Sequence, residues 1–362
     1  MVSEFAVNRL HAAGLVEPEV ASVAKPDDVI EVIQANRAPW LEATLLNLYG
    51  SHFTTLSRLK WTGQLTDAVK AFLIREKGSV TCALLFRRQG RELQVLNEVA
   101  YISAAQIRRF TSHVFTWWIG IDTIRFTAIR TDLLQSEYPM RRRSVAQDFV
   151  LPLPRSIQEF FEGLPQATRK TIRIYSTRIK REFPTFAHRV YEGRQVRPEY
   201  IQQILALNRT DATASGTLAA AGRKRRNVDT ESLIALARDC GQVAVSTIEG
   251  RICAGSISYR ARDSFFLLVS SRDANLDGYR LHALNQYRAM TACIQAGAKE
   301  CHFSSGRKED KVQLGGRPVT LESIALYRTR VRAAFDAPHT MKNAAMTLFR
   351  HAGDMVRAAM VT

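Results

Sequence analysis

One turn of this sequence has the residues to bind a phosphate group. A strand at residues 264–271 (SFFLLVSS) leads through a polar turn, residues 272–280, into a long helix that begins at Leu281. The first N–H groups of a helix have no partner within the helix, and the helix dipole places partial positive charge there. Gly278 lets the backbone approach a ligand closely, and Arg280 adds a charge. The turn therefore predicts binding of a phosphorylated carrier such as an acyl-coenzyme A.

We expect the strand before the turn and the turn itself to contact different parts of the carrier. Val269, Ser270 and Ser271 could align a pantetheine arm through strand-like hydrogen bonds. The residues predicted to cradle the pyrophosphate are Leu276, Asp277, Gly278, Tyr279 and Arg280. Asp277 is an acidic neighbour for a phosphate, and it could instead cap the helix. The alternative is an ordinary connection between a strand and a helix, with glycine at a tight bend.

Acyl transfer to an amine or a hydroxyl needs a base for the acceptor's proton and an acid for the departing thiolate. Tyr287, two turns into the helix, could be the acid, or it could be a core aromatic residue. His302 lies near the end of the next strand, residues 299–306, as a base or as a half-buried structural histidine. Residues 211–227 are an Ala/Gly/Thr-rich stretch that we expect to be a mobile loop. Asp211, at the end of the helix before this loop, is a further candidate base.

The chain is strongly basic. It contains 51 Lys and Arg against 34 Asp and Glu, a formal net charge of +17. The excess is concentrated in residues 141–143, in a predicted helix at residues 169–181, and in residues 223–226. In that helix Ile172, Tyr175 and Ile179 form one apolar stripe, and the other faces are cationic. This surface would attract nucleic acid, an anionic membrane, a phosphorylated ligand or an acidic acyl-carrier protein.

The composition excludes several classes. No apolar run approaches the roughly 20 residues needed to span a bilayer, and the most apolar segment, residues 114–121 (VFTWWIGI), is short. The start of the chain lacks a secretory signal, and the five cysteines form no CxxC pair, which favours reduced thiols in the cytoplasm. We find no metal-ligand spacing, Walker loop, GxGxxG motif or GxSxG motif, so a metal or nicotinamide enzyme is not expected.

Strands alternate with helices, which indicates an α/β (α+β) fold. Residues 27–50 are expected to be helical, and a second unit is expected to begin near Leu151. Two hairpins are similar, residues 69–88 (VKAFLIREKGSVTCALLFRR) and residues 243–260 (VAVSTIEGRICAGSISYR). Each has a strand, a glycine turn and a second strand with a Cys-Ala pair. A duplicated fold explains this better than a chance likeness of two hairpins.

From about residue 151 to 328 the sequence resembles the GNAT-type acyltransferases of the CelD, or cellulose-biosynthesis, group, relatives of the FemAB transferases. The resemblance rests on the entry helix at residues 156–182, the EGRICAG turn, the helix-opening Gly278 and the stretch at residues 303–316 (FSSGRKEDKVQLGG). It implies two GNAT-like domains in tandem, each with a mixed, mostly antiparallel sheet flanked by helices. The domains would be residues 26–150, degenerate, and 151–335, between a loose extension at 1–25 and a helical tail at 336–362.

The resemblance also implies positions for the acceptor substrate. They are Asn208, Gly306, Asp310 and Lys311. Two of these positions depart from the family pattern. The family often has His at the position of Asn208 and Tyr at that of Asp310, which precedes the family's Lys, here Lys311.

The resulting hypothesis is a cytoplasmic acyltransferase, of the acetyltransferase type, that needs no metal. Its donor would be acetyl-CoA, another acyl-CoA or an acyl-carrier protein, and its acceptor a saccharide or another amine or hydroxyl of exopolysaccharide or envelope synthesis. It could lie at the inner face of the membrane. The alternatives are a nucleic-acid-binding protein that uses the basic clusters, and a catalytically silent GNAT scaffold in a polysaccharide synthesis complex.

Overall fold

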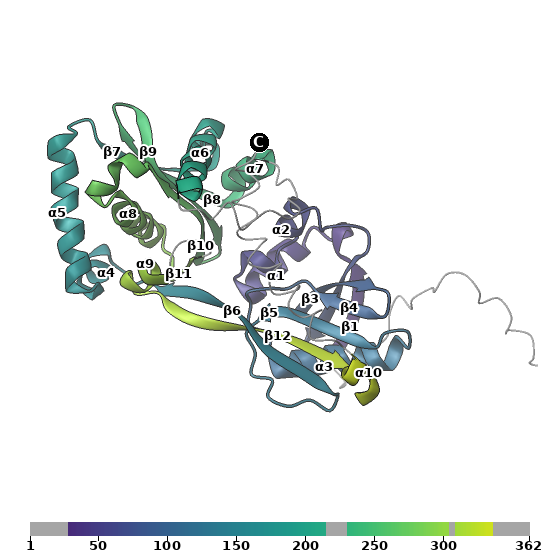
Figure 1. Cartoon of the computed structure of the whole chain (residues 1–362). Coiled ribbons are helices and arrows are strands. Elements are labelled where there is room, and N and C mark those ends of the chain that lie inside the picture. Colours follow the sequence, from purple (N-terminus) through teal and green to yellow (C-terminus); the bar gives the residue numbers. More distant parts are fainter. Residues whose placement is uncertain (1–27, 215–229, 304–307, 336–362) are drawn as a thin grey trace, which may run out of the picture.

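The computed structural model describes residues 28–214, 230–303 and 308–335, and these ranges build one twelve-stranded sheet flanked by helices (Figure 1). The strands are β1 (Asp28–Gln34), β2 (Val69–Glu76), β3 (Ser79–Gln89), β4 (Glu92–Val95), β5 (Thr123–Ile129), β6 (Met140–Pro152), β7 (Ala187–Glu192), β8 (Gly241–Ile248), β9 (Arg251–Ala261), β10 (Ser264–Arg272), β11 (Glu300–Phe303) and β12 (Arg317–Tyr327). The α-helices are α1 (Leu41–Tyr49), α2 (Leu56–Trp61), α3 (Ala104–Trp117), α4 (Ile157–Gly163), α5 (Gln166–Glu182), α6 (Pro198–Ala214), α7 (Thr230–Cys240), α8 (Leu281–Gln295), α9 (Lys308–Gln313) and α10 (Arg330–Phe335).

The two halves of the sheet repeat one pairing pattern. The order is β1-β2-β3-β4-β5-β12-β6-β11-β10-β9-β8-β7. In the first half, β1 to β4 pair antiparallel and β4 pairs parallel with β5. In the second half, β7 to β10 pair antiparallel and β10 pairs parallel with β11. The long antiparallel pair of β6 and β12 joins the halves. The predicted fold class, mixed α/β with a mostly antiparallel sheet, is confirmed.

Strand alternation divides the second half into two apolar layers. On β10, Phe266 packs with α6 and α7, whereas Phe265 and Leu267 pack with α4, α5 and α8. Figure 1 shows the same layering, with α8 on one side of these strands and α6 on the other. The face of a strand residue is set by the two-residue period of the pleat. Side chains from β10 onward can therefore be assigned to the α8 side or to the α6 side.

Residues from the first half of the chain pack on the α6 side of the sheet. Phe53, Val99 and Ala128 belong to the same apolar cluster as α6 and α7. The ring of His52 lies 3.8 Å from that of Tyr259. The two halves therefore share a core as well as a sheet.

Several element predictions need correction. Residues 28–34 form strand β1 instead of a helix, because their β-branched residues pair along the whole length of β2. Strands β6 and β12 were not expected. Most of β6 has no alternating apolar pattern, and its pairing with β12 and β11 gives it extended structure. Helix α6 runs to Ala214, so Asp211 lies in a helix and not in a loop. The predicted terminal extension and tail, and residues 215–227, lie outside the described residues.

We expect Gly241→Ala to destabilise the fold. Gly241 is the first residue of β8, directly after α7, and an added Cβ would lie 2.5 Å from the Ala237 Cα and 2.7 Å from its carbonyl oxygen. Backbone atoms cannot move aside as a flexible side chain can, so the cost should be roughly 1–3 kcal/mol. Urea denaturation measures it. Gly163→Ala is the control, since nothing lies within 4 Å of the corresponding Cβ; equal midpoints for the two variants would contradict this packing.

Candidate functional site

The described parallel contact between strands β10 and β11 is short. Within the described residues it runs from Ser264–Glu300 to Leu267–Phe303. A register shift follows between Leu267 and Val269, and β10 continues to Arg272 against β9 on its other edge. Beyond Leu267, the β11-facing edge of β10 has no strand partner within the described residues. Backbone groups along a strand edge can bond an extended ligand, which is the role predicted for Val269 to Ser271.

The helix that follows β10 begins without a side-chain cap. Arg280 is the N-cap residue of α8, its φ is 51°, and its side chain makes no capping hydrogen bond. The first turn of α8 therefore presents N–H groups and the positive end of the helix dipole to any ligand nearby. The Arg280 guanidinium is exposed at the same place. Phosphate groups favour helix starts of this kind, and phosphate binding stays the prediction for this turn.

The turn residues lie close to the basic helix α5. A short 3₁₀ helix, Ala274–Tyr279, contains them. The Asp277 carboxylate accepts hydrogen bonds from Arg272, which lower its pKa, so Asp277 does not cap α8. The Tyr279 hydroxyl donates to Glu182 on α5, and Leu276 packs on the apolar layer beneath α8. Gly278 has open space where a Cβ would point, so nothing within the described residues blocks a ligand there.

Several polar side chains of β10 and α8 have no hydrogen-bond partner within the described residues. Within the described residues no hydrogen bond is made by Ser270 Oγ, Ser271 Oγ, His282 Nδ1 or either polar atom of the Asn285 amide. Asn285 is fully buried on the same helix face as Leu281 and Ala289. An unpaired buried amide costs roughly 1–3 kcal/mol, so native proteins rarely leave one without a ligand or water. The arrangement fits a polar ligand such as the amide-rich arm of coenzyme A.

His302 lies on β11 opposite Phe266 of β10, on the α6 side. Its Nδ1 is 2.6 Å from Asp148 Oδ2 on β6, and its Nε2 is 3.2 Å from Glu300 Oε1. The ring stacks on Phe266 with centroids 4.3 Å apart. Burial opposes the charged form, but the hydrogen bonds to Asp148 and Glu300 outweigh it and raise the pKa of His302 to about 9. At neutral pH the ring is therefore a cation with both N–H groups engaged.

Lys311 and Asp310 sit at the same end of the sheet. The Lys311 ammonium is buried, donates to the Phe303 carbonyl at 3.0 Å and lies 5.0 Å from the centre of the Phe149 ring. Burial lowers the pKa of Lys311, an effect that the Asp148 carboxylate opposes. Asp310 Oδ2 is 3.4 Å from His282 Nε2, which places α9 beside the first turn of α8.

The remaining predicted residues are less closely defined. The Tyr287 ring packs on Phe160 and Phe161 of α4, and burial raises the pKa of its hydroxyl. The backbone of α6 includes Asn208 and Asp211, but their side chains lie outside the described part of the structure, as does Gly306. Those residues stay predictions.

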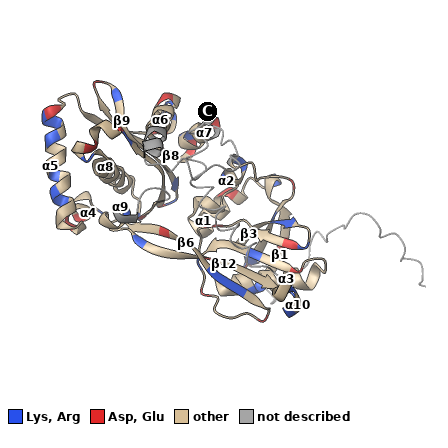
Figure 2. Ribbon diagram, in the orientation of Figure 1, with Lys and Arg blue, Asp and Glu red and all other residues tan. Residues whose placement is uncertain are grey.

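The basic clusters occupy two different elements. Helix α5 forms one edge of the molecule and is rich in Lys and Arg (Figure 2). Its predicted stripe is confirmed, because Ile172 and Ile179 are buried and Tyr175 packs on the same layer. Residues 141–143 lie in β6, where Arg142 pairs with Glu322 at 2.6 Å. Residues 223–226 lie outside the described residues. Among the described helices, none is long and apolar enough to cross a bilayer.

The helix of the first half that corresponds to α8 is α3, and its N-terminus is capped by residues of the chain itself. Helix α3 has a complete capping box, in which Ser103 Oγ accepts from the Gln106 N–H and Gln106 Oε1 accepts from the Ser103 N–H. The Ala104 N–H donates to Asp132 Oδ1 at 2.7 Å. A carboxylate and a hydroxyl of the chain itself thus occupy the positions that a phosphate would need. Of the two corresponding helix N-termini, that of α3 is capped and that of α8 is not.

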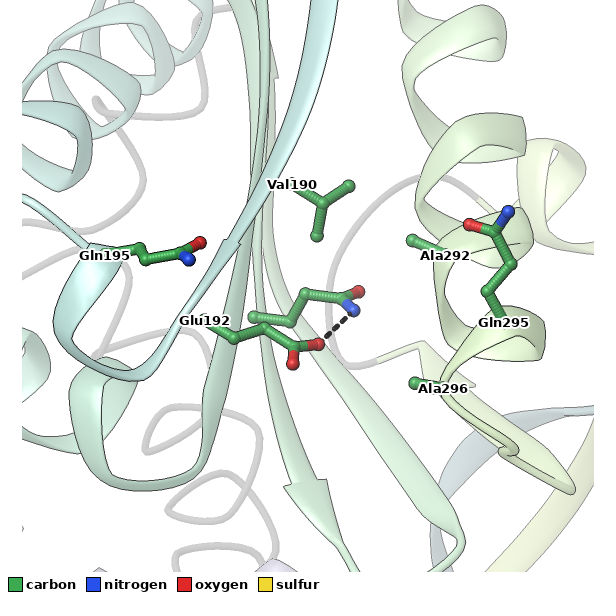
Figure 3. Close-up of a pocket in the computed structure, with 7 residues that line it drawn as sticks. Val190, Glu192, Gln195, Ala292, Gln295 and Ala296 are labelled. Carbon is green, nitrogen blue, oxygen red and sulfur yellow. Dashed lines mark hydrogen bonds between the residues drawn. The ribbon is translucent and has the colours of Figure 1, made fainter.

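A separate groove lies at the other end of α8. It has a volume of about 400 Å³ between the edge strand β7, β8 and the last turns of the helix (Figure 3). Its walls include Gln195, Gln295 and the bonded pair Gln242–Glu192, and none of its lining residues is cationic. Since none of the predicted donor contacts lines it, we do not place a phosphorylated ligand in this groove.

The comparison with protein families agrees with this geometry. Residues 166–312 match the family model described as an acetyltransferase (GNAT) domain. The matched segment contains β10, β11, the uncapped start of α8 and the basic helix α5, that is, all parts of the candidate site except the contribution of β6. We found no curated protein that this chain matches in sequence.

Several solved structures share the fold of most of the chain. FemX is similar with a TM-score of 0.57 at 10% identity, over 82% of this chain and 98% of FemX. L-PGS from Bacillus licheniformis gives 0.53 at 15%, over 87% and 97%. A conserved protein of unknown function from Bacteroides thetaiotaomicron VPI-5482 gives 0.52 at 12%, over 79% and 96%. At these identities the likeness concerns the fold alone.

Asp148, His282 and Asn285 were missed by the sequence reasoning. Asn285 carried a signal, because helical periodicity places it with Leu281 and Ala289 on the buried face, where an amide is unusual. Asp148 carried none, since its strand is formed by pairing with β12 that the local sequence does not indicate.

The pair of His302 and Asp148 predicts a pH-dependent stability. The pKa of His302 is raised above its unfolded value of about 6.5, so its stabilisation is complete below about pH 6.5 and is lost as pH rises to about 9. Over that range the free energy of unfolding should fall by roughly 3 kcal/mol through this group. Asp148→Asn should remove most of this slope, as measured by urea denaturation across the pH range.

His188→Gln is the control for this measurement. Burial lowers the pKa of His188 to about 4, so it is neutral throughout the range tested. Its variant should keep the slope of the parent protein. An unchanged slope in Asp148→Asn would show that His302 is not charged by this pair.

Proposed function

We propose that the protein is an acyltransferase that moves an acyl group from acyl-CoA to an acceptor amine or hydroxyl. The observation that carries the proposal is the uncapped start of α8 in the segment that matches the GNAT model. Strand β10, whose β11-facing edge is the proposed pantetheine site, leads into α8 through the 3₁₀ turn Ala274–Tyr279. A pantetheine arm on that edge would bring its pyrophosphate to the helix N–H groups, which is the site that phosphates favour.

The donor contacts follow the same path. Val269, Ser270 and Ser271 would bond the pantetheine amides, with Asn285 as a further partner. The 3₁₀ turn from Leu276 through Asp277, Gly278 and Tyr279 to Arg280 would surround the pyrophosphate. Arg272 and Asp277 bond each other at present, so a bound phosphate would compete with Asp277 for that guanidinium.

For this reaction the protein needs mainly to position the acyl donor and the acceptor and to transfer protons. The acceptor nitrogen or oxygen attacks the thioester carbonyl carbon, the C–S bond breaks, and coenzyme A leaves as a thiolate that must gain a proton. Tyr287 keeps its proton at neutral pH and is the proposed acid. Asp211 is a proposed base.

The α6 side of β10 is the proposed acceptor side, because α6, the helix that carries Asn208 and Asp211, packs on it. His302 is charged there and would act through its field, with Lys311 below the strand ends, instead of accepting a proton. Asn208, Gly306 and Asp310 are proposed acceptor contacts.

We propose the division into residues 26–150 and 151–335, with the donor site in the second domain alone. The closed start of α3 supports this, since its amide groups are already bonded. Resemblance to the CelD group supports a saccharide or another acceptor of envelope or exopolysaccharide synthesis.

A thermal-shift series with acetyl-CoA and longer acyl-CoAs tests the donor site. A ligand that binds only the folded protein stabilises it, by about 2.7 kcal/mol at a hundredfold excess over Kd. We expect the melting temperature to rise with at least one acyl-CoA. Gly278→Val should abolish the rise without lowering the melting temperature of the free protein, because its side chain would enter open space next to the turn.

Gly163→Val is the matched control. It also adds a side chain where nothing lies within 4 Å, but at the end of α4. It should respond to acyl-CoA as the parent protein does. No response of the parent protein to any donor would overturn the acyltransferase proposal. Salt-sensitive binding of nucleic acid would then favour the nucleic-acid alternative, and pull-down of membrane partners would favour a silent scaffold.

A further inference from the structure

The loop after α3 is an exposed apolar tip. It belongs to the most apolar segment of the sequence, residues 114–121, which is too short to span a bilayer. Phe115 and Val114 of this segment are buried, but Ile119 is 82% exposed and Trp117 is 45% exposed. Burial in the core explains why the first part of the segment is apolar, but it does not explain the apolar residues of the exposed tip. Large apolar side chains grouped at a surface mark a contact with another body.

A second exposed apolar pair lies next to this tip. The guanidinium of Arg328 donates to the carbonyls of Phe115, Trp118 and Ile121, which fixes the loop to the end of β12. Helix α10 begins two residues later. Its Val331 is 66% exposed and its Phe335 is 77% exposed, and they are one helical turn apart.

Arginines surround this apolar surface. The Arg88 guanidinium lies against Gly120 of the loop, and Arg91 pairs with Asp122. Arg332 donates to Thr123 Oγ1 at 3.4 Å, and Arg330 is exposed at the start of α10. With Arg328 this makes five arginines around one tip. Asp122 and Glu137 carry the opposing charge, so the surface is positive overall.

We propose that this surface, the Trp117–Ile119 tip with the exposed residues of α10 and the five arginines, docks the protein on an anionic lipid bilayer. Tryptophan is suited to the interface between headgroups and acyl chains, and apolar tips insert just below it. Arginines at that level are attracted to anionic headgroups. A second copy of the chain fits less well, because a symmetric contact would place the same arginines against each other.

Helix α5 is the more basic surface, but it lacks the apolar component. Its exposed large apolar residue is Ile174, at 48%. Arg178 is paired with Glu182, and Arg173 lies over the Phe161 ring at 4.9 Å. The membrane surface thus lies at the loop after α3 and at α10, whereas the proposed donor site lies at β10 and the start of α8. The inference does not depend on the acyl-transfer proposal.

Vesicle cosedimentation with the full chain tests the proposal. The probes are vesicles of equal parts phosphatidylglycerol and phosphatidylcholine, and vesicles of phosphatidylcholine alone. We expect binding to the anionic vesicles that weakens with salt. Ile119→Ser should weaken it roughly tenfold, and Arg330→Gln with Arg332→Gln should weaken it roughly fivefold per arginine. All three positions are exposed, so the urea midpoints should not change.

Two matched variants lie on α5. Ile174→Ser removes an exposed isoleucine, and Lys180→Gln with Arg181→Gln removes two exposed charges. They should bind vesicles as the parent protein does. Absence of binding by the parent protein would overturn the proposal. So would loss of binding in the α5 variants alone, which would move the membrane face to α5. Self-association that Ile119→Ser abolishes, without vesicle binding, would assign the surface to a second copy.

Discussion

The uncapped start of α8 is the constraint on which the rest of the site depends. Strand β10, which leads to it, is held on one edge by β9, and on its other edge it pairs with β11 from Ser264 to Leu267 within the described residues. Strand β11 is held in turn by β6. The unpaired Asn285 lies on α8 itself, and the His302 cluster lies on β11.

The two halves of the chain share one pattern of strand pairing, but the corresponding helix N-terminus is capped in the first half and uncapped in the second. The start of α3 is satisfied by Ser103, Gln106 and Asp132, a set that makes the helix stable without a ligand. The start of α8 has no such cap, and the chain bears the cost of unsatisfied groups there. Proteins accept local costs of this kind at functional sites, where a ligand supplies the missing partners. The first half instead contributes packing to the shared core, and its loop after α3 forms part of the surface proposed to meet lipid.

Local patterns predicted most of the elements near the donor site, because those elements are stabilised locally. Residues 243–248 and 264–271 have strong strand sequences, and the helix at Leu281 follows a clear turn. The sequence could not indicate β6, which extends only because β12 and β11 pair with it, nor therefore the contact of Asp148 with His302. It also could not show that Asp277 bonds Arg272. Contacts between distant segments decide protonation and capping, and periodicity does not reveal them.

Amide hydrogen exchange with and without coenzyme A tests the central claim most directly. If the ligand bonds the free edge of β10 and the first turn of α8, exchange should slow at residues 268–272 and 281–283. The start of α3, residues 104–106, should exchange at the same rate in both conditions, because its amide groups are already bonded within the chain. Unchanged exchange at β10 and α8, or protection at α3 instead, would contradict the assignment of the donor site.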